Sequence, residues 1–344
     1  MASNLAAWIT EAKSRPLKVD EAVKWKAGPG EVLIKNAAVA ANPVDWKIQT
    51  FAGLPLPYPN ILGSDLAGTV EEVGEGVTRL TKGQRVMASF SPSIATGNPA
   101  NGAYQHYTVV PEILVSPIPN DLDFEHATVL PLALSTAAAA LYEDKHFDLP
   151  MPGVSASDVS NGTILIWGAA GAVGLAAIQL ARASGLHVIA VASARNHDFV
   201  RSIGAHYTLD YKSKTFSQDV AAAIKETDKF IGIFDAVSSP ETFSTISDIL
   251  EGVGPTKVVV LMAPPTTHSE NYRVSHSVSF SILKPPYDRV ADGLWRKFIP
   301  EALERGLIKA KPEPLVVGFG LEKVQDAMDR QKKGVSAQKI VVTL

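Results

Sequence analysis

The sequence contains no cysteine among its 344 residues. This absence excludes disulfide bonds, thiolate nucleophiles, zinc sites built on thiolates and iron–sulfur clusters. It also fits a reducing compartment. The first residues do not combine a basic region, an apolar core and a small-residue cleavage site, so no secretory signal is evident. We therefore expect a cytoplasmic protein.

The sequence also lacks clustered charge of one sign. No run of five lysines and arginines occurs, and the formal net charge is −3 with a pI near 6.3. Proteins that bind nucleic acid or anionic membranes electrostatically usually carry a basic cluster. The most apolar run, residues 127–142, falls short of the roughly 20 residues of a membrane span. A small molecule is thus the expected partner, with no role for nucleic acid or membrane.

The apolar pattern changes along the chain and predicts three segments. Residues 1–126 contain short β-rich runs separated by Gly, Pro and Asn, which favours a compact β-barrel or sandwich. Residues 127–299 alternate apolar strand runs with helical patterns, which favours a doubly wound parallel sheet of the α/β class. Residues 300–344 return to a strand, helix and strand, and can rejoin the first segment. The chain thus predicts two domains, the second inserted into the first.

A glycine-rich turn stands between an expected strand and an expected helix. Residues 163–167 form the strand, residues 168–174 the turn and residues 175–184 the helix, which Gly185 ends. A turn in this position is typical of a dinucleotide-binding fold. The alternative is a tight packing turn without a ligand. A second strand at the right distance favours the ligand.

The small residues of this turn have separate expected roles. Against the pattern G-x-G-x-x-G, the sequence has Ala169, Gly171 and Gly174. Gly171 lets the backbone approach a pyrophosphate, and Gly174 lets the helix pack on the sheet. The free N–H groups and the positive dipole end of the helix stabilise phosphates. We predict that cofactor phosphates bind over Ala170, Gly171, Ala172 and Val173.

The end of the next strand indicates which dinucleotide binds. An NAD site places an acidic residue about 20 residues beyond the turn, on the ribose 2′-hydroxyl. No acid stands there, and the strand instead ends in Ser193, Arg195 and Asn196, with Tyr211 after the following strand. These donors suit a 2′-phosphate, which favours NADPH over NADH. The alternative for Arg195 is a solvated surface side chain.

Several motifs in one order resemble the medium-chain dehydrogenase/reductase superfamily over nearly the whole chain. They are NPVDWK (42–47), ILGSDLAGTVEEVGEGV (61–77), GQRV (83–86), NGAYQHYTVV (101–110), VLPLALSTAAAAL (129–141), GAAGAVG (168–174) and the final GVSAQKIVVTL. The chain is similar to the zinc-free quinone oxidoreductase branch and, through NPVDWK and SARN, to fungal trans-acting enoyl reductases. The resemblance implies a discontinuous catalytic domain with a GroES-like β-barrel and an inserted Rossmann-type domain.

Zinc-dependent members of this superfamily differ from this chain at their metal ligands. They carry an early cysteine ligand and a Gly-His-Glu where this chain has Gly63-Ser64-Asp65, and the four-cysteine loop of structural zinc is also missing. The eight histidines are scattered singly. We therefore expect no catalytic metal. Reduction of a conjugated C=C bond does not need one, because ordinary hydrogen-bond donors stabilise the enolate.

The resemblance assigns Lys47 and Thr136 to the catalytic site and to the cofactor, because these positions approach the nicotinamide and its phosphates. Alternatives are an exposed lysine and a helix N-cap, and Asp45 either orients Lys47 or caps a turn. We also assign Leu261 and Met262 to the cofactor site. The remaining proton donors to consider are Tyr58, Tyr272 and His276, and the sequence does not select among them.

These observations predict an NADPH-dependent, zinc-independent reductase of α,β-unsaturated carbonyl compounds. The substrate is an enone or an enoyl group, free or bound to a carrier protein. Quinone reduction is the alternative activity, because it needs the same cofactor and a looser pocket. A nucleotide-binding partner or scaffold protein without turnover is the alternative of another class. The sequence leaves the oligomeric state open.

Overall fold

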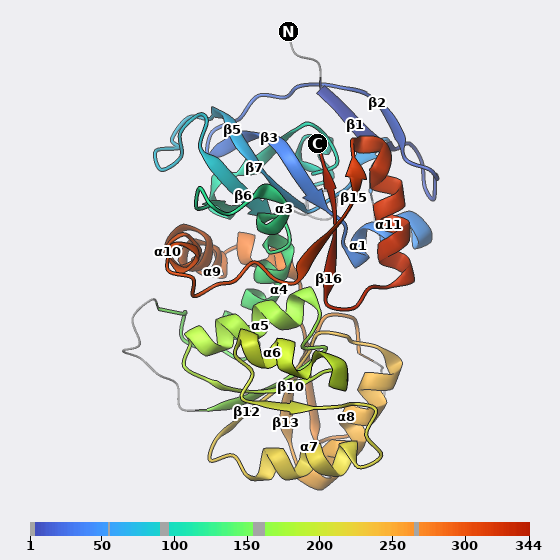
Figure 1. Cartoon of the computed structure of the whole chain (residues 1–344), viewed down its shortest axis with the longest axis vertical. Helices are drawn as coiled ribbons and strands as arrows, with labels where there is room; N and C mark the ends of the chain where they lie inside the picture. The colour runs from blue at the N-terminus through green and yellow to red at the C-terminus, as the bar shows by residue number, and fades with distance from the viewer. Residues whose placement is uncertain (1–3, 54–55, 90–95, 154–161, 265–267) are drawn as a thin grey trace. The chain divides into compact units, whose positions relative to one another are not determined.

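A computed structural model of the chain describes residues 4–53, 56–89, 96–153, 162–264 and 268–344 (Figure 1). The chain divides into two compact units. The first unit comprises residues 1–132, 295–304 and 310–344, and the second comprises residues 133–294 and 305–309. From the sequence we predict domain boundaries at 126/127 and 299/300. These boundaries stay a prediction of which segments fold independently.

The second unit is built on a six-stranded parallel sheet in the order β11-β10-β9-β12-β13-β14. This order places β9, the first strand of this sheet in chain order, beside β12, so the connections turn to opposite sides between these two strands. Ligands of open α/β sheets bind outside the carboxyl ends of the strands at such a switch point. The strands are β9 (Thr163–Trp167), β10 (His187–Val191), β11 (Tyr207–Leu209), β12 (Phe230–Asp235), β13 (Thr256–Val260) and β14 (Tyr272–His276).

The parallel strands are apolar on both faces, as strands buried between two helical layers must be. Side chains alternate along a strand, so Leu165 and Trp167 of β9 face one side. They pack in one cluster with Phe216 of α7 (Phe216–Lys225) and Ile246 of α8 (Pro240–Val253). Helix α5 (Ala172–Ala183) packs along β9 and β10. This arrangement confirms the predicted doubly wound α/β sheet.

Helices connect the strands of the second unit. Helix α5 begins at Ala172, three residues earlier than the helix predicted to start at residue 175. The predicted turn 168–174 is therefore shorter, because Gly174 lies inside the first turn of α5. The helical segments are α4 (Pro131–Tyr142), α5 (Ala172–Ala183), η3 (Ala194–Asn196), α6 (His197–Ile203), α7 (Phe216–Lys225), α8 (Pro240–Val253), η4 (Ser279–Leu283) and α9 (Asp288–Ala291).

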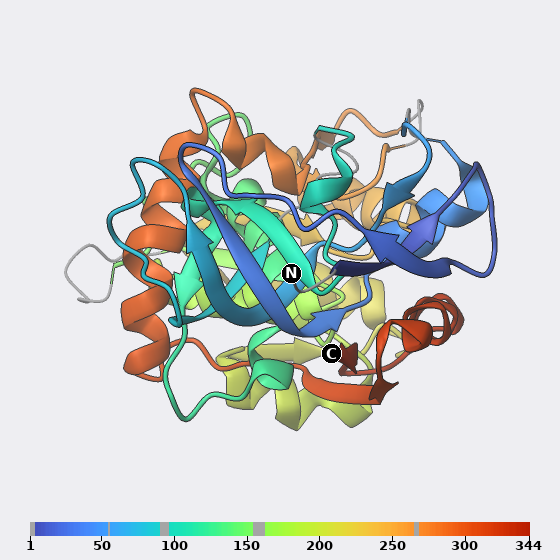
Figure 2. The same cartoon turned by 90° about the horizontal axis from the view of Figure 1, so that it is seen from above.

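The first unit contains a mainly antiparallel seven-stranded sheet and a three-stranded sheet in the order β2-β1-β4 (Figure 2). Residues 338–343 rejoin this unit, because Val341 of β16 lies opposite Ala40 of β3. This is the predicted GroES-like part of the fold. Its strands are β1 (Asn4–Ile9), β2 (Lys18–Ala22), β3 (Glu31–Ala40), β4 (Asn60–Ile61), β5 (Asp65–Val73), β6 (Arg85–Ser89), β7 (Tyr107–Pro111), β8 (Val115–Pro117), β15 (Glu313–Phe319) and β16 (Gln338–Thr343).

Short helices complete the first unit, and two of them, α1 and α11, pack against each other. Helix α1 carries the NPVDWK motif, and the basic last turn of α11 contains Arg330, Lys332 and Lys333. The helical segments are α1 (Pro43–Phe51), η1 (Pro99–Asn101), η2 (Glu112–Leu114), α3 (Phe124–Ala127), α10 (Ile299–Glu304), η6 (Leu321–Lys323) and α11 (Val324–Lys333), and the π-helical η5 (Asp292–Phe298) leads into α10.

One stretch, Phe124–Tyr142, is long and apolar enough to cross a membrane by length and composition. The run predicted from the sequence to be too short for a span, residues 127–142, forms the larger part of this stretch. In the folded chain 72% of the most apolar window is buried within the protein. A helix covered by protein in this way belongs to the core, so its apolar composition reflects packing and not contact with lipid.

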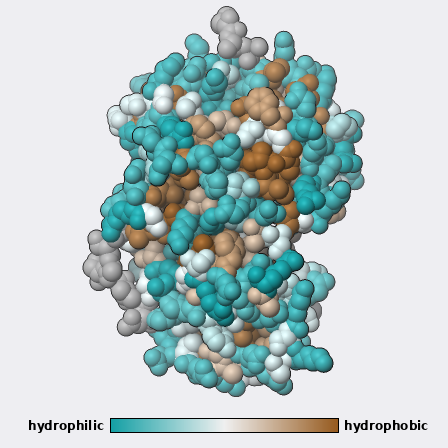
Figure 3. Space-filling model, in the orientation of Figure 1, coloured by the Kyte–Doolittle hydropathy of each residue, from teal (hydrophilic) through white to brown (hydrophobic). Residues whose placement is uncertain are grey.

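The surface is largely hydrophilic on the face that Figure 3 shows, with hydrophobic residues gathered in patches. Among the residues described, the most exposed large apolar side chains are Phe319, Phe51 and Val23, at 75%, 63% and 62%. Single exposed apolar residues are ordinary on protein surfaces. Phe51 differs because it neighbours a second aromatic residue, Trp46, with 6.1 Å between the ring centroids.

Candidate functional site

The glycine-rich turn joins β9 to α5 with the geometry of a tight cradle. Gly168 adopts a φ of 72°, in the left-handed region that favours glycine, and Gly171 is the N-cap of α5. A Cβ atom on Gly174 would lie 2.3 Å from the carbonyl oxygen of Gly168. Helix α5 therefore starts in direct contact with the turn, which is the packing role predicted for Gly174.

The outer side of the turn is less crowded than its helix side. A Cβ atom on Gly171 would make a single tight contact, with the carbonyl oxygen of Gly168 at 3.3 Å, which a small shift of that carbonyl would relieve. In the described ranges, no group accepts a hydrogen bond from the amides of Ala172 and Val173. Backbone amides without a hydrogen-bond acceptor at a helix N-terminus favour the binding of an anion. Ala172 and Val173 thus offer amides to the predicted pyrophosphate site, which also includes Ala170 and Gly171. The amide of Gly171 itself donates to the carbonyl oxygen of Gly168 at 3.0 Å, so its contribution is close approach and not a hydrogen bond.

Two neighbouring strand ends bring the predicted ribose-phosphate residues to one edge of the sheet. Val191 of β10 lies opposite Leu209 of β11, and the amide of Ala192 donates to Leu209 at 3.0 Å. Ser193, Arg195 and Asn196 follow the first strand, and Tyr211 follows the second. The Asn196 side-chain amide donates to Ser193 Oγ at 3.2 Å.

Arg195 and Tyr211 are the exposed members of this set. The Arg195 guanidinium has no ion pair or hydrogen bond to any residue in the described parts of the chain. Tyr211 is 48% exposed. An unpaired guanidinium beside hydroxyl and amide groups is suited to a phosphate monoester, because its planar fork binds two oxygens at once. The preference for NADPH stays a prediction.

An acid that the sequence analysis overlooked stands at the same edge. Asp210 follows β11 directly, and its carboxylate accepts the amide of Lys212 at 3.0 Å in a local turn. In the sequence it is the acidic residue of TLDY, directly after the predicted strand. Lys212 lies beside Tyr211, with Nζ 5.8 Å from the ring centroid. The edge therefore combines two cationic groups with one carboxylate.

The other side of the switch point consists of residues after β12 and β13. A Cβ atom on Gly168 would lie 2.6 Å from Val237 Cγ2, so the loop after β12 touches the glycine turn. Ser238 Oγ accepts the amide of Leu261 at 2.8 Å, and this bond ties the loop to the end of β13. The next residue, Met262, is 43% exposed. Leu261 and Met262 thus border the region beside the cradle.

Asp235 organises this loop, and sequence reasoning missed it. Its buried carboxylate accepts the amides of Val237 and Ser238 at 3.0 and 2.9 Å and the hydroxyl of Thr242 at 2.5 Å. Burial raises the pKa of Asp235 despite these donors. The signal available in the sequence was an acid that ends the apolar run FIGIF, followed by small residues.

Lys47 lies on α1 in the first unit and is half-buried. Burial lowers the pKa of its ammonium group. Helix α1 starts at Pro43, and the backbone amide of Asn42 donates to Asp45 Oδ2 at 2.7 Å, as in a capping box. Of the two roles considered for Asp45, the structure shows the capping role.

A buried polar network surrounds the start of α1. Tyr104 donates its hydroxyl to Asp45 Oδ2 at 2.7 Å, and the Asn42 side-chain amide donates to Asp65 Oδ2 at 2.8 Å. Lys339 Nζ lies 2.8 Å from Asp65 Oδ2 and also donates to Asn42 Oδ1. Burial, opposed by the Tyr104 and Asn42 hydrogen bonds, raises the pKa of Asp45 to about 6.

The same network decides whether zinc fits where zinc-dependent relatives bind it. Asp65 occupies the position of the glutamate in the Gly-His-Glu motif, and the Lys339 ammonium already neutralises it at 2.8 Å. No group of three or more His, Asp or Glu in the part of the chain that the structure describes is arranged to hold a metal ion. Lys339 supplies positive charge where a metal would otherwise be needed, so the residues present do not fit zinc.

Thr136 lies within α4, in the second unit, and its side chain is largely buried. Helix α4 begins at Pro131, so the suggested N-cap role for Thr136 is wrong. The reason is that proline is favoured in the first turn of a helix, and the helix therefore starts before the alanine run. Thr136 and Lys47 belong to different units of the chain.

The remaining candidates for proton donor differ in their surroundings. In the described ranges, the buried hydroxyls of Tyr58 and Tyr272 have no hydrogen-bond partner. His276 is exposed, and its Nε2 lies 3.2 Å from the carbonyl oxygen of Leu261. Burial raises the pKa of Tyr272. None of the three is singled out by its contacts as the donor.

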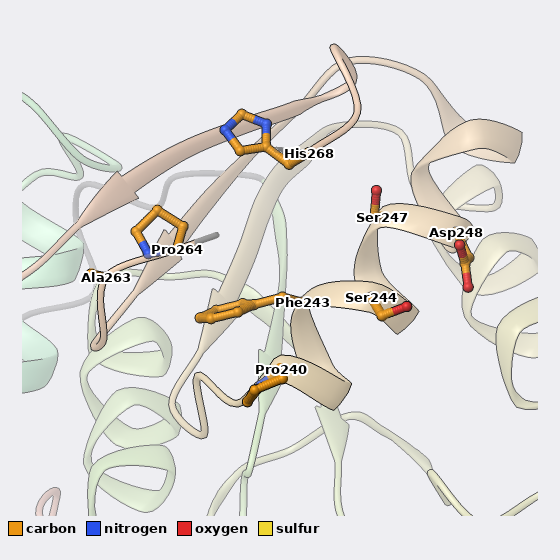
Figure 4. A pocket seen from close by; sticks show the side chains of 8 residues that line it. All are labelled: Pro240, Phe243, Ser244, Ser247, Asp248, Ala263, Pro264 and His268. Atoms are coloured by element: carbon orange, nitrogen blue, oxygen red, sulfur yellow. The ribbon is translucent and has the colours of Figure 1, made fainter. Parts of the chain in front are cut away.

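A pocket of about 500 Å³ opens in the second unit between α8 and the segment after β13 (Figure 4). The Phe243 ring and Pro240 form its apolar side, and Ser247, Asp248 and His268 lie at its margin. It contains none of the predicted cofactor residues. The cradle is instead a shallow surface over the strand ends, as a site for an extended dinucleotide is expected to be.

Comparison with known proteins now defines the class. The family described as alcohol dehydrogenase GroES-like domain matches residues 28–120, and the zinc-binding dehydrogenase family matches residues 172–281. The trans-enoyl reductase himH of Aspergillus japonicus is 40% identical over 343 residues, which cover 99% of this chain and 97% of that protein. The chain belongs to the medium-chain dehydrogenase/reductase superfamily, which confirms the resemblance carried by the motifs.

Solved structures share the fold over the full length. An alcohol dehydrogenase superfamily protein from Novosphingobium aromaticivorans has a TM-score of 0.80 at 25% identity, covering 99% of both chains. A quinone oxidoreductase from Pseudomonas syringae pv. tomato has a TM-score of 0.73 at 23% identity, covering 100% of both. This protein is therefore an oxidoreductase of a superfamily that uses nicotinamide dinucleotides, and it is related to fungal trans-enoyl reductases.

Proposed function

We propose that this protein is a zinc-independent, NADPH-dependent reductase of the C=C bond in α,β-unsaturated carbonyl compounds. The observation that carries the proposal is the near full-length relationship to a trans-enoyl reductase at 40% identity. The cradle at residues 168–173 and the hydrogen-bond donors after β10 and β11 support it. The substrate is an enone or an enoyl thioester, free or bound to a carrier protein, and the protein acts in the cytoplasm.

The amides of Ala170, Ala172 and Val173 would hold the cofactor's pyrophosphate, and Gly171, whose amide donates to the Gly168 carbonyl oxygen at 3.0 Å, would let the pyrophosphate approach the backbone. Ser193, Arg195, Asn196 and Tyr211 would hold its 2′-phosphate, and Leu261 and Met262 would border the nicotinamide. When bound, NADPH supplies the hydride. The protein's task is then to orient the two reactants and to stabilise the charge that develops on the substrate.

Negative charge develops on the carbonyl oxygen when a conjugated double bond accepts hydride at the β carbon. Lys47 and Thr136 are the donors proposed to stabilise this oxygen. Burial lowers the pKa of Lys47, which makes its ammonium a readier proton donor than an exposed one. Loss of one such donor costs about 3 kcal/mol, or roughly a hundredfold in rate. The carbonyl group itself stays intact.

Zinc independence rests on Asp65, whose carboxylate pairs with Lys339. Metal analysis of purified protein should find no stoichiometric zinc, and a chelator should leave turnover unchanged. Loss of activity with chelator, regained on adding zinc, would overturn this part of the proposal.

The experiment follows deuterium from labelled NADPH into the product of an enone and of an enoyl thioester. Label at the β carbon of a saturated product supports the proposal, whereas label on a carbinol carbon shows carbonyl reduction. Turnover of quinones alone favours the quinone reductase alternative. NADPH binding without any transfer favours the scaffold alternative.

Two variants locate the donors. Lys47→Ala and Thr136→Ala should each lower kcat by about a hundredfold while the melting temperature changes little. The matched control is Lys26→Ala, which removes an exposed lysine outside these motifs and should keep full activity. If both variants reduced the enone at the wild-type rate, Lys47 and Thr136 would not be the donors.

A further inference from the structure

A second pocket, of about 480 Å³, lies in the first unit, and none of the residues assigned above to the cofactor or to catalysis lines it. Of these residues, Lys47 is close to it, because its Nζ lies 5.8 Å from the ring centroid of the lining residue Trp46. We call it the basic groove. It is formed by the turn after β1, by α1 and by the end of α11. The groove is lined by four cationic residues, Lys13, Arg15, Lys332 and Lys333. Trp46 and Asp329 also line it.

The positive charges of the basic groove are mostly unopposed. Arg15 pairs with Asp329, which is the only carboxylate among the lining residues described. Lys332 Nζ donates to Thr50 Oγ1 at 3.1 Å, which leaves its charge in place. Lys13 and Lys333 are exposed and have no ion pair within the described ranges. Three lysines thus present net positive charge on a protein whose overall charge is −3.

Aromatic surface accompanies this charge. The Trp46 indole lines the groove, and its Nε1 donates to Gln331 Oε1 at 2.6 Å, which fixes the ring. Phe51, one turn further along α1, is 63% exposed beside it. Fixed aromatic residues next to cationic ones are typical of the centres of protein interfaces, where apolar contact gives affinity and charge selects the partner.

We propose that the basic groove is a docking site for an acidic amphipathic helix of a partner protein. Glutamates three and four residues apart on a helix lie about 5–6 Å apart and can face Lys13, Lys332 and Lys333 together. Leucines beside them cover Trp46 and Phe51. An exposed phenylalanine has no use in a site for a free phosphate ion, so the apolar surface favours a helix over a small anion.

A purely local role for these lysines makes a different prediction. Lysines in the last turn of a helix offset its dipole, and Lys332 and Lys333 end α11. If that were their whole role, reversing their charge would lower stability and leave binding unchanged. The proposal requires loss of binding in a protein that remains folded.

The test measures binding of a labelled synthetic helical peptide, with glutamates on one face and leucines on the adjoining face, to the full chain by fluorescence anisotropy. Wild-type protein should bind it, and raising the salt concentration should weaken binding. Lys332→Glu combined with Lys333→Glu should weaken it about tenfold or more. The control, Lys214→Glu with Lys225→Glu, reverses two exposed lysines of the second unit and should bind like wild type.

Two further arms separate the sources of affinity. Phe51→Ala should also weaken peptide binding, and the same peptide with glutamine for glutamate should not bind. Inorganic phosphate should displace the peptide no more than another salt does at the same ionic strength. Equal binding by wild type and the double variant, or displacement by low phosphate, would overturn the proposal. Because no arm uses turnover, its failure is distinct from failure of the proposed reductase activity.

Discussion

Lys339 Nζ lies 2.8 Å from Asp65 Oδ2, and the two side chains are 7% and 0% exposed. Asp65 also accepts the side-chain amide of Asn42 at 2.8 Å and the backbone amide of Leu132 at 2.6 Å. One carboxylate therefore joins β5 and β16 to the start of α1, which carries Lys47, and to Leu132 at the end of the same segment of the first unit. The acid of the Gly63-Ser64-Asp65 sequence is therefore part of a structural ion pair in this chain.

Removing one partner of this pair should destabilise the protein strongly. Lys339→Met leaves a buried carboxylate without its cation and should lower the free energy of unfolding by about 3–5 kcal/mol. Asp65→Asn should have a similar effect. The double variant should recover part of the loss, because no unpaired charge remains. Denaturant unfolding of the four proteins measures the coupling, and strictly additive losses would show that the pair is not coupled.

Asp45 should make stability depend on pH in a defined direction. Its pKa is raised from 3.8 to about 6, so between these values the folded state holds a proton that the unfolded state has lost. Stability contributed by this group is therefore complete below about pH 4 and decreases as pH rises to about 6, by about 3 kcal/mol. The difference between wild type and Asp45→Asn, measured by unfolding across this range, should show this slope. A flat difference would contradict the prediction.

Gly171 and Gly174 should fail in different ways when substituted. A side chain on Gly174 collides with the Gly168 carbonyl, so Gly174→Val should lower the melting temperature markedly. Gly171 has an ordinary φ of −80°, and an added Cβ would meet only the Gly168 carbonyl oxygen, at 3.3 Å and not 2.3 Å, so Gly171→Val should lose much less stability but should lose dinucleotide binding. Thermal unfolding and cofactor titration distinguish the two. Wild-type affinity in Gly171→Val would mean that the pyrophosphate binds elsewhere.

Arg195 should set the preference for NADPH over NADH. A charge-assisted hydrogen bond to the 2′-phosphate contributes about 1.5–3 kcal/mol, or about tenfold or more in affinity. Arg195→Ala should therefore weaken NADPH binding by that factor and leave NADH binding nearly unchanged. Arg273→Ala removes another exposed arginine of the second unit and serves as control. Equal affinity of the wild-type protein for both cofactors would refute the assignment.

The features predicted well from the sequence are those encoded locally. The strand from 163 to 167, the glycine turn and the following helix were recognisable because apolar runs and glycines mark them within a short window. The helix start was misplaced because glycine disfavours helix interiors. Gly174 overrides that tendency, since only a residue without Cβ fits against Gly168.

The buried network was not predictable in the same way. Lys339 occurs in SAQKIVV, where it reads as a polar residue on an alternating strand, and nothing local indicates that it is buried. Its partner Asp65 is hundreds of residues earlier in the sequence. Only the pairing of β16 with β3 brings the two together. Asp235 differs, because its three donors, Val237, Ser238 and Thr242, lie only two, three and seven residues further along the chain. It was missed because no sequence pattern predicted the conformation of the loop after β12.

The pairing of β16 with β3 also orders the assembly of the chain during synthesis. The parallel sheet needs only residues 163–276, so its strands are complete once that segment has left the ribosome. The antiparallel sheet lacks β15 and β16 until residues 313–343 have emerged. Until then the part of β3 that pairs with β16 has no strand partner on that side. Unpaired strand edges promote aggregation. Nascent chains that stall between these two points should therefore be the ones that depend most on chaperones.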